Sequence, residues 1–334
     1  MTMRDPADAP RRRHPNGFII VAVLWILAAL ATLASIFSIY LANTAVFLSL
    51  NDNAIQTEAL VSAGLQLAAY QVSAPKPDTP QAGAAAPQAS GSANAPPRPT
   101  RGAFNFRLAR ANVAVDFISE AARIDLNSAS PQLLANFLTG LGVQRQQAEQ
   151  YAKRIQGWIT TPKGPSPLTA AQDDEEALYR AAGRSYSPRG GPFAHIDELS
   201  LVLDLPSALI ERAKPYLTVY SGTQQINVLD AAPEVLAAIP GMTPDLLNTL
   251  IEARRTAPNP QAISRLIGGL SGVGSVEGSD AYRVQVRIRY DDGRQDAAEV
   301  VILTGLTDKP YRVLSWRDGS DALSGPDQPF FRPR

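Results

Sequence analysis

The chain has 334 residues, with 31 basic and 31 acidic side chains, two histidines and no cysteine. Its formal charge of zero provides no global field that would attract the whole chain to nucleic acid or to anionic lipid. The lack of cysteine excludes a disulfide framework, a thiol nucleophile and a thiolate metal site. The length accommodates a membrane anchor and about two folded domains.

The first 17 residues form a short leader whose arginines cluster at residues 11–13. An apolar run from Gly17 to Ala42 follows, and no charged residue occurs between Phe18 and Asn51. Because a bilayer core needs about 20 apolar helical residues, we predict a transmembrane helix over residues 18–42. The basic leader predicts a cytoplasmic N-terminus, with the bulk of the chain in the periplasm. The run is too long for an ordinary secretory signal, so an uncleaved signal anchor is the alternative.

The sequence continues in a helix-compatible form as far as residue 72. Its apolar residues recur every three to five positions, so we predict that the helix extends over residues 43–72 and packs on a sheet. Residues 73–102 consist almost entirely of Ala, Pro, Gly, Ser, Gln and Thr. Such a composition buries too little apolar surface to fold, and it predicts a disordered loop.

Alternating apolar and polar residues predict strands at residues 104–108 and 113–118. The pattern then changes to helix pairs: one follows Arg123 and has its turn at Gly140 and Gly142, another follows His195, and a third, related to the first, begins at Ile226. These pairs resemble helix-hairpin-helix units, which hold nucleic-acid phosphates with the amides of a glycine turn. Residues 121–220 carry ten basic and ten acidic side chains, without the basic excess that nucleic-acid binding requires. We therefore expect no nucleic-acid partner.

The last third of the chain predicts an antiparallel meander. Apolar side chains alternate with Arg and Gln from Tyr282 to Tyr290, and further strands are predicted at residues 297–305 and 311–316. The arginine face of the first of these strands is interpreted as solvated, with binding of an acidic partner as the alternative. Residues 319–334 are predicted to form a loose tail.

Enzymatic motifs are missing from the sequence. His14 lies in the leader and His195 precedes an acidic helix start, and the chain has neither a G-x-S-x-G nor an H-E-x-x-H pattern. We therefore predict that the protein is not an enzyme.

The junction between Gly17 and Phe18 resembles the cleavage site of type IV prepilins, since a charged leader ends in glycine and an apolar helix starts with phenylalanine. The resemblance implies that a prepilin peptidase cuts after Gly17 and methylates the new amine of Phe18. Most pilin-like subunits carry a glutamate at the fifth mature position, where this sequence has Ala22. An unpaired carboxylate is costly inside a membrane. A subunit that lacks it suits the first place in a filament.

Several phrases in the sequence resemble the K subunit of the minor pseudopilins of type II secretion systems: RIDLN from Arg123, PF-x-x-IDEL from Pro192, PYLTV from Pro215 and PEVLAA from Pro233. The resemblance implies an α+β, pilin-like fold in which a long N-terminal helix packs on a small antiparallel sheet. It further implies a large α-helical domain, residues 123–220, inserted into a head formed by residues 103–122 and 221–318.

The same resemblance implies a function in exporting folded proteins across the outer membrane, by capping the pseudopilus tip and helping to initiate its assembly. The implied partners are the I and J subunits (GspI and GspJ), the prepilin peptidase and the inner membrane, with the secretin or the exported protein as further candidates. The alternative function is a membrane-anchored periplasmic protein that binds nucleic acid through its hairpin repeats.

One feature of the family is altered in this sequence. K subunits commonly have Trp-x-Asp-x-Asp after the first helix pair, a loop suited to Ca²⁺, but here Trp158 is followed by Ile-Thr-Thr-Pro. The acidic residues Asp173, Asp174 and Glu176 lie further along the chain. We interpret them as the acid-rich start of a helix, with calcium ligation as the alternative. No cofactor is expected.

Overall fold

The computed structural model describes residues 16–73, 98–160, 170–256, 259–268, 270 and 272–319. The side chains of residues 16–19, 42–53 and 170–174 lie outside this described part. The chain divides into two compact units, Met1–Ala59 and Leu60–Arg334. Most of the predicted leader, of the loop at 73–102 and of the tail at 319–334 falls outside the described residues.

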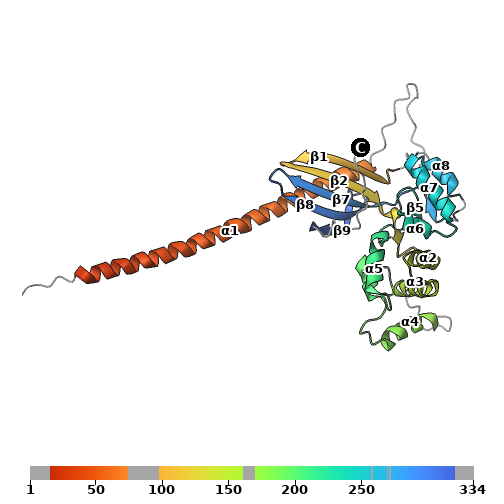
Figure 1. Ribbon diagram of the computed structural model, residues 1–334, viewed down its shortest axis with the longest axis horizontal. Coiled ribbons are helices and arrows are strands. Elements are labelled where there is room, and N and C mark those ends of the chain that lie inside the picture. The colour runs from red at the N-terminus through yellow and green to blue at the C-terminus, as the bar shows by residue number, and fades with distance from the viewer. Residues whose placement is uncertain are drawn as a thin grey trace, which may run out of the picture. The chain divides into compact units, whose positions relative to one another are not determined.

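A five-stranded antiparallel sheet forms the centre of the second unit, in the order β1-β2-β7-β8-β9 (Figure 1). Its strands are β1 (Arg101–Leu108), β2 (Ala111–Ser119), β7 (Ala281–Tyr290), β8 (Gln295–Leu303) and β9 (Arg312–Asp318). The neighbours β2 and β7 are far apart in the sequence, so everything between them is an insertion into the sheet. The predicted α+β class is confirmed.

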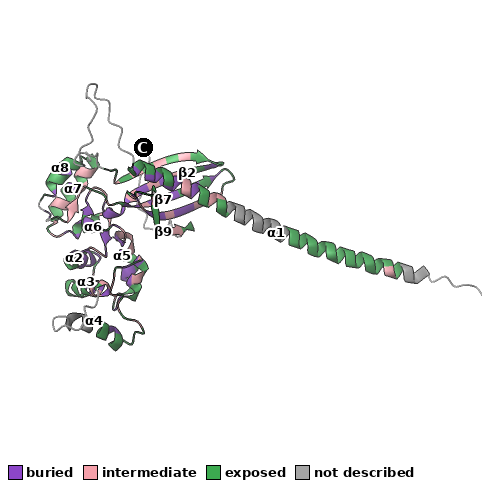
Figure 2. Cartoon of the chain, turned by 180° about the vertical axis from the view of Figure 1, so that it is seen from behind, coloured by how far each residue is buried: buried purple, intermediate pink, exposed green. Residues whose placement is uncertain are grey.

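The end of helix α1 (Asn16–Ser73) covers one face of this sheet. Leu60, Val61, Leu65, Ala68 and Val72 are buried there against apolar side chains of the strands, as the predicted stripe requires (Figure 2). The alternation predicted for β7 is also confirmed, because its apolar side chains are buried and the side chains at 287 and 289 are exposed.

The loop predicted for residues 73–102 is shorter at both ends than the composition indicated. Ser73 is the last residue of α1, and Arg101 is the first residue of β1, paired with Ile118 of β2. Two polar residues at the described end of this segment make contacts with the rest of the fold: Arg98 pairs with Asp280, and the hydroxyl of Thr100 donates to Asp230.

Gly102 pairs directly with Phe117 across β1 and β2, and the phenyl ring occupies the space beside the glycine. A Cβ atom at residue 102 would lie 2.4 Å from the Cζ atom of Phe117. Gly102→Ala is therefore expected to lower the free energy of unfolding by about 1–3 kcal/mol, measured by chemical denaturation. The control is Gly140→Ala, where a Cβ atom meets nothing within 4 Å. Equal stability of the two variants would contradict the prediction.

The insertion contains two structural repeats of the same plan. In the first repeat, β3 (Ile124–Asp125) leads to α2 (Pro131–Gly140) and α3 (Arg145–Ile159), and β4 (Leu217–Thr218) returns parallel to β3. Between α3 and β4 lie α4 (Ala170–Ala181), η2 (Ile196–Leu201), α5 (Ser207–Ala213) and η3 (Lys214–Tyr216), and a short η1 (Glu120–Ala122) precedes β3.

The second repeat is a shorter copy. In it, β5 (Ile226–Asn227) leads to α6 (Pro233–Ala237), α7 (Pro244–Thr256) and α8 (Pro260–Leu266), and β6 (Gly274–Ser275) returns parallel to β5. The equivalent turns contain Gly142 and Gly241, whose φ angles of 91° and 88° favour glycine. In both repeats a proline stands at the start of the first helix, where a missing N–H is tolerated.

The two hydrophobic clusters divide the chain differently from the predicted boundary at residue 220. One buried cluster runs from Ile124 to Leu270 and includes both repeats, while the sheet and α1 form a separate cluster. Asn136 in α2 also donates a 3.1 Å hydrogen bond to the carbonyl of Ala238 beside α6. The second repeat shares its core with the first, because the buried apolar side chains of both repeats belong to one cluster. We call residues 124–276 the helical layer.

Candidate functional site

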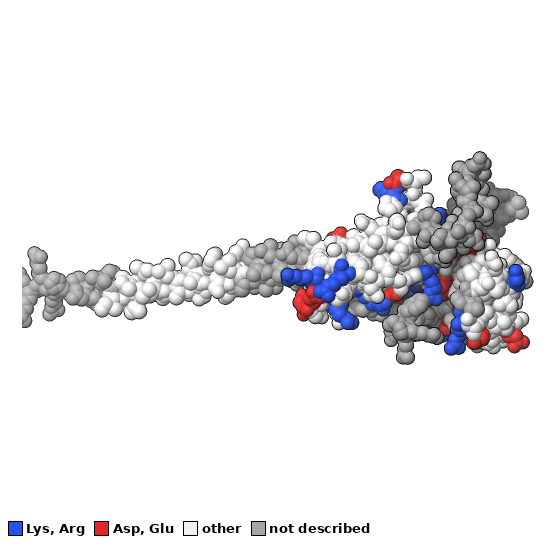
Figure 3. Space-filling model, turned by 90° about the horizontal axis from the view of Figure 1, so that it is seen from above, with Lys and Arg blue, Asp and Glu red and all other residues white. Residues whose placement is uncertain are grey.

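The start of α1 is the first candidate. Residues Ile20–Leu41 form a helix of 22 residues with a mean hydropathy of 2.6, long and apolar enough to cross a membrane. Its large side chains are exposed; Trp25, for example, is 75% exposed. Figure 3 shows this described segment without any charged side chain. The hydroxyls of Thr32 and Ser35 donate to carbonyls one turn earlier, so the helix satisfies them itself.

The predicted processing residues lie at the beginning of this helix. Gly17 and Phe18 have helical backbone, and their side chains lie outside the described part. Ala22 is part of the apolar surface, at the position where pilin-like subunits usually have a glutamate. Cleavage after Gly17 and methylation of Phe18 stay predictions.

The glycine turns of the helix pairs are the second candidate, because free amides there would suit a phosphate. In the first turn the amides of Gly142 and Val143 donate to carbonyls of α2, at 2.9 and 3.1 Å. Arg212 donates to the carbonyl of Leu141 in the same turn. In the second turn the amide of Met242 donates to Ile239 at 3.0 Å. These amides are engaged within the hairpins, which argues against a phosphate site.

The acid-rich helix α4 is the third candidate. The side chains of Asp173 and Asp174 lie outside the described part. Glu176 pairs with Arg180 one turn later, at 3.1 Å. Within the described ranges, no group of three or more His, Asp or Glu residues could hold a metal ion. Calcium ligation by Asp173, Asp174 and Glu176 stays the alternative interpretation of these residues.

Glu175, which the sequence did not single out, is an acidic residue of α4 whose side chain is largely buried. It lies beside a cavity of about 680 Å³ between α3 and α4, and it pairs with Arg154 at 2.9 Å. Burial raises the pKa of Glu175, against the attraction of Arg154. A signal was present in the sequence: Gly157 leaves space for this carboxylate, since a Cβ atom there would lie 2.8 Å from it.

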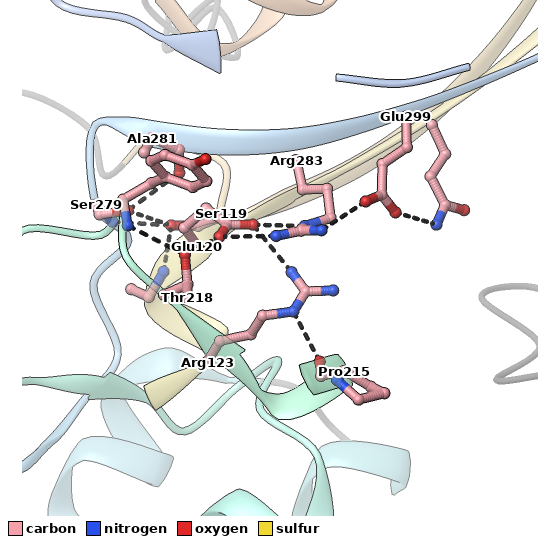
Figure 4. A network of polar contacts seen from close by, with 12 residues as sticks. Ser119, Glu120, Arg123, Pro215, Thr218, Ser279, Ala281, Arg283 and Glu299 are labelled. Carbon is pink, nitrogen blue, oxygen red and sulfur yellow. Dashed lines mark hydrogen bonds and ion pairs between the residues drawn. The ribbon is translucent and has the colours of Figure 1, made fainter. Parts of the chain in front are cut away.

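The fourth candidate is a cluster of charged side chains between the sheet and the helical layer, shown in Figure 4. We call it the Glu120 cluster; its members are Glu120, Arg123, Thr218, Arg283 and Glu299. The Glu120 side chain is fully buried, and those of Arg283 and Glu299 are 14% and 13% exposed. Two positive and two negative side chains therefore lie together with little exposure to solvent.

Every oxygen of the Glu120 carboxylate has partners. Oε1 accepts from Arg123 at 3.0 Å and from Arg283 at 2.8 Å, while Oε2 accepts from Arg283 at 3.2 Å and from the hydroxyl of Thr218. Burial alone raises the pKa of Glu120, but the charges of Arg283 and Arg123 outweigh it and hold this pKa at about 2. Burial, together with the charge of Arg283, lowers the pKa of Arg123 to about 10.

The Glu120 cluster corrects one interpretation of the sequence. The arginine face of β7 was expected to be solvated or to bind an acidic partner, yet Arg283 binds Glu120 and Glu299, and Arg287 binds Asp116. The solvated interpretation was wrong for Arg283. No local pattern could have revealed this, because Glu120 and Arg283 are 163 residues apart.

Comparison with known proteins shows a similarity over part of the chain. Residues 104–222 match the family model described as type II secretion system (T2SS), protein K. This part of the chain is therefore similar to protein K of the type II secretion system. The resemblance that the sequence motifs indicated is thereby confirmed.

Two type II secretion system K proteins are among its relatives. The one from Klebsiella pneumoniae is 29% identical over 125 residues, 37% of each chain. The one from Pseudomonas aeruginosa is 27% identical over 154 residues, 45% of this chain and 44% of the relative. The chain thus spans less than half the length of the curated relatives it matches. In the crystal structure of a GspK-GspI-GspJ complex from enterotoxigenic Escherichia coli, one chain is similar with 20% identity and a TM-score of 0.46, over 65% of this chain and 83% of that one.

Proposed function

We propose that this chain is a minor pseudopilin of a type II secretion system, which caps the tip of the pseudopilus and helps to initiate its assembly for export of folded proteins. The observation that carries the proposal is that one chain has both a segment similar to protein K and an exposed apolar N-terminal helix. The first feature supports the assignment to a type II secretion system. The second is the element by which a pilin-like subunit enters a membrane and then a filament.

The anchor supports a single crossing of the inner membrane. Residues 20–41 are apolar and exposed, and the preceding leader is basic. The positive-inside rule then places the N-terminus in the cytoplasm and the folded unit in the periplasm. Once outside the bilayer, such a helix needs other apolar helices around it. The partners we propose are the GspI and GspJ subunits.

The position at the tip follows from Ala22. A subunit with a glutamate there must satisfy its carboxylate within the assembly, because an unpaired charge is costly in an apolar environment. Ala22 has no carboxylate, so this subunit needs no neighbour ahead of it to pair with a buried charge. The helical layer, inserted between β2 and β7, provides bulk that a stacking subunit would have to avoid.

Cleavage of the leader tests this proposal. In cells that contain an active prepilin peptidase, we expect the membrane-extracted chain to begin with a methylated Phe18, as measured by mass spectrometry of the intact protein. Without the peptidase the chain should keep its leader. Gly17→Leu is expected to abolish cleavage, because the bulky side chain replaces the residue at the scissile bond. Thr32→Ala, further along the same helix, is the matched control and should be cleaved normally.

A chain that retains its leader despite active peptidase would contradict the pseudopilin proposal. It would leave a signal-anchored periplasmic protein, the alternative that the long apolar run allows.

A further inference from the structure

The chain passes between the sheet and the helical layer at two places. It leaves the sheet at Ser119–Arg123, after β2, and returns at Glu277–Ala281, before β7. We call these segments the two crossings. Because β2 and β7 are adjacent strands, with Ser119 paired to Tyr282, both crossings lie at the same end of this strand pair. Two chain segments that lie side by side between two bodies can act as a hinge unless other contacts prevent bending.

Hydrogen bonds join the two crossings to each other. The amide of Ser279 donates to the hydroxyl oxygen of Ser119 at 2.8 Å, and the two serine hydroxyls lie 3.2 Å apart. The amide of Ser119 donates to the carbonyl of Thr100 at 2.7 Å. At Gly278 the crossings are so close that a Cβ atom would lie 3.1 Å from the Ser119 hydroxyl. The crossings therefore form one linked pair.

The Glu120 cluster links the first crossing, Ser119–Arg123, both to the sheet and to the helical layer (Figure 4). On the side of the sheet, Arg283 in β7 binds Glu120 and also Glu299 in β8, at 2.5 Å. On the side of the helical layer, Thr218 in β4 donates to Glu120, and the guanidinium of Arg123 donates to the carbonyl of Pro215 at 2.9 Å. Glu120 thus contacts partners on both sides, Arg283 in the sheet and Thr218 in the helical layer.

A second attachment lies away from the Glu120 cluster. Asp230, in the turn after β5, accepts from the hydroxyl of Thr100 at 2.5 Å and pairs with Arg101 of β1 at 3.3 Å. Its side chain is only 2% exposed. A second attachment restricts the rotation that a single attachment would allow. Within the described residues, Tyr220 of the helical layer also bonds Ser315 of β9, so several contacts hold the helical layer on the sheet.

We propose that Glu120 is a latch that fixes the orientation of the helical layer on the sheet, so that the two move as one rigid body. Removing one member of a buried charge cluster leaves its partners uncompensated, and such clusters can specify one arrangement where apolar packing would allow several. The low pKa of Glu120 keeps the latch charged throughout the physiological pH range. The inference does not depend on the role in secretion.

The distance between the two bodies provides the test. The chain has no cysteine of its own, so two introduced cysteines can carry spin labels without background. We choose Asn112→Cys in β2 and Gln132→Cys in α2, both exposed, in the full-length chain in detergent micelles. Pulsed electron spin resonance should give a single narrow distance distribution with Glu120 present. Glu120→Gln removes the charge at nearly constant volume and is expected to broaden this distribution, with loss of the single peak.

Glu149→Gln is the matched control, because Glu149 pairs with Arg145 on an exposed helix surface and should leave the distribution unchanged. If Glu120→Gln fails to fold, Thr218→Val decides: it removes one donor to Glu120, keeps the charges paired and should broaden the distribution less. An unchanged distribution in a folded Glu120→Gln, or in Thr218→Val where that variant has to decide, would overturn the proposal. A broad distribution before any substitution would also overturn it.

Discussion

Replacing Arg283 with methionine is expected to lower the free energy of unfolding by about 3–5 kcal/mol at neutral pH. The guanidinium binds both Glu120 and Glu299, which are almost entirely buried. Its loss leaves Arg123 as the one cation on Glu120 within the Glu120 cluster and removes the guanidinium from Glu299. Methionine occupies a similar space, so the loss of charge pairing is measured without a large cavity.

The effect should depend on pH in a defined direction. The pKa of Glu120 is lowered from 4.5 to about 2, so its contribution to stability is fully present above pH 4.5 and is lost as the pH falls towards 2. Without Arg283 this pKa rises and the contribution shrinks. The difference between wild type and Arg283→Met should therefore decrease between pH 5 and pH 2.

Denaturant unfolding followed by circular dichroism at several pH values measures this difference. Arg287→Met is the control, since its pair with Asp116 is half exposed on the arginine side and should contribute less than about 1 kcal/mol. If both variants lose the same free energy of unfolding, the buried Glu120 cluster contributes no more to stability than an exposed ion pair, and the prediction is wrong.

Replacing Trp158 with alanine is expected to cost about 3–5 kcal/mol, an effect of similar size with a different cause. The indole is 3% exposed at the end of α3 and packs with three other rings: Tyr179, Tyr186 and Phe193, at centroid distances of 6.0–6.4 Å. Its N–H also points to Glu198, at 3.4 Å. These four aromatic residues hold α4 and the segment before η2 against α3.

Thermal unfolding and near-ultraviolet circular dichroism would measure the loss of Trp158. Because the cavity lies within the helical layer, hydrogen exchange should increase in α3 and α4 and stay unchanged in β7 and β8. Tyr70→Ala is the control, since this ring is 70% exposed and its removal should change stability by less than about 0.5 kcal/mol. Uniform acceleration of exchange throughout the sheet would contradict a local effect.

The sequence predicted those parts of the fold that depend on local periodicity. The predicted apolar stripe of α1 indicated the buried face correctly from Leu60 to Ala68, whereas its member Ile55 is exposed. The alternation in β7 also indicated the buried face correctly. The similarity of the segments at Arg123 and Ile226 was also visible in the sequence, because both contain an asparagine, a Pro-x-x-Leu-Ala phrase and a glycine turn between helices.

The parts that escaped prediction depend on residues distant in the sequence. Glu120 follows an ordinary strand, and nothing near it shows that Arg283 will be its partner. The packing of the second repeat against the first was missed for a similar reason, since the boundary was placed where the sequence phrases changed rather than where apolar faces meet. Glu175 was passed over because charge alone does not show which acid of a helix points inward.

The adjacency of β2 and β7 has a consequence for how such a chain can vary. Ser119 and Tyr282 are register partners, so the two ends of the intervening segment meet across a single strand pair. The segment inserted between β2 and β7 can therefore have very different lengths, because the distance between its two ends stays the same and the entropy of closing a loop grows slowly with its length. A short turn from β2 to β7 would leave the strand order complete, so the strand order itself does not depend on the helical layer. Its size and surface can diverge while the part that packs on α1 stays constant.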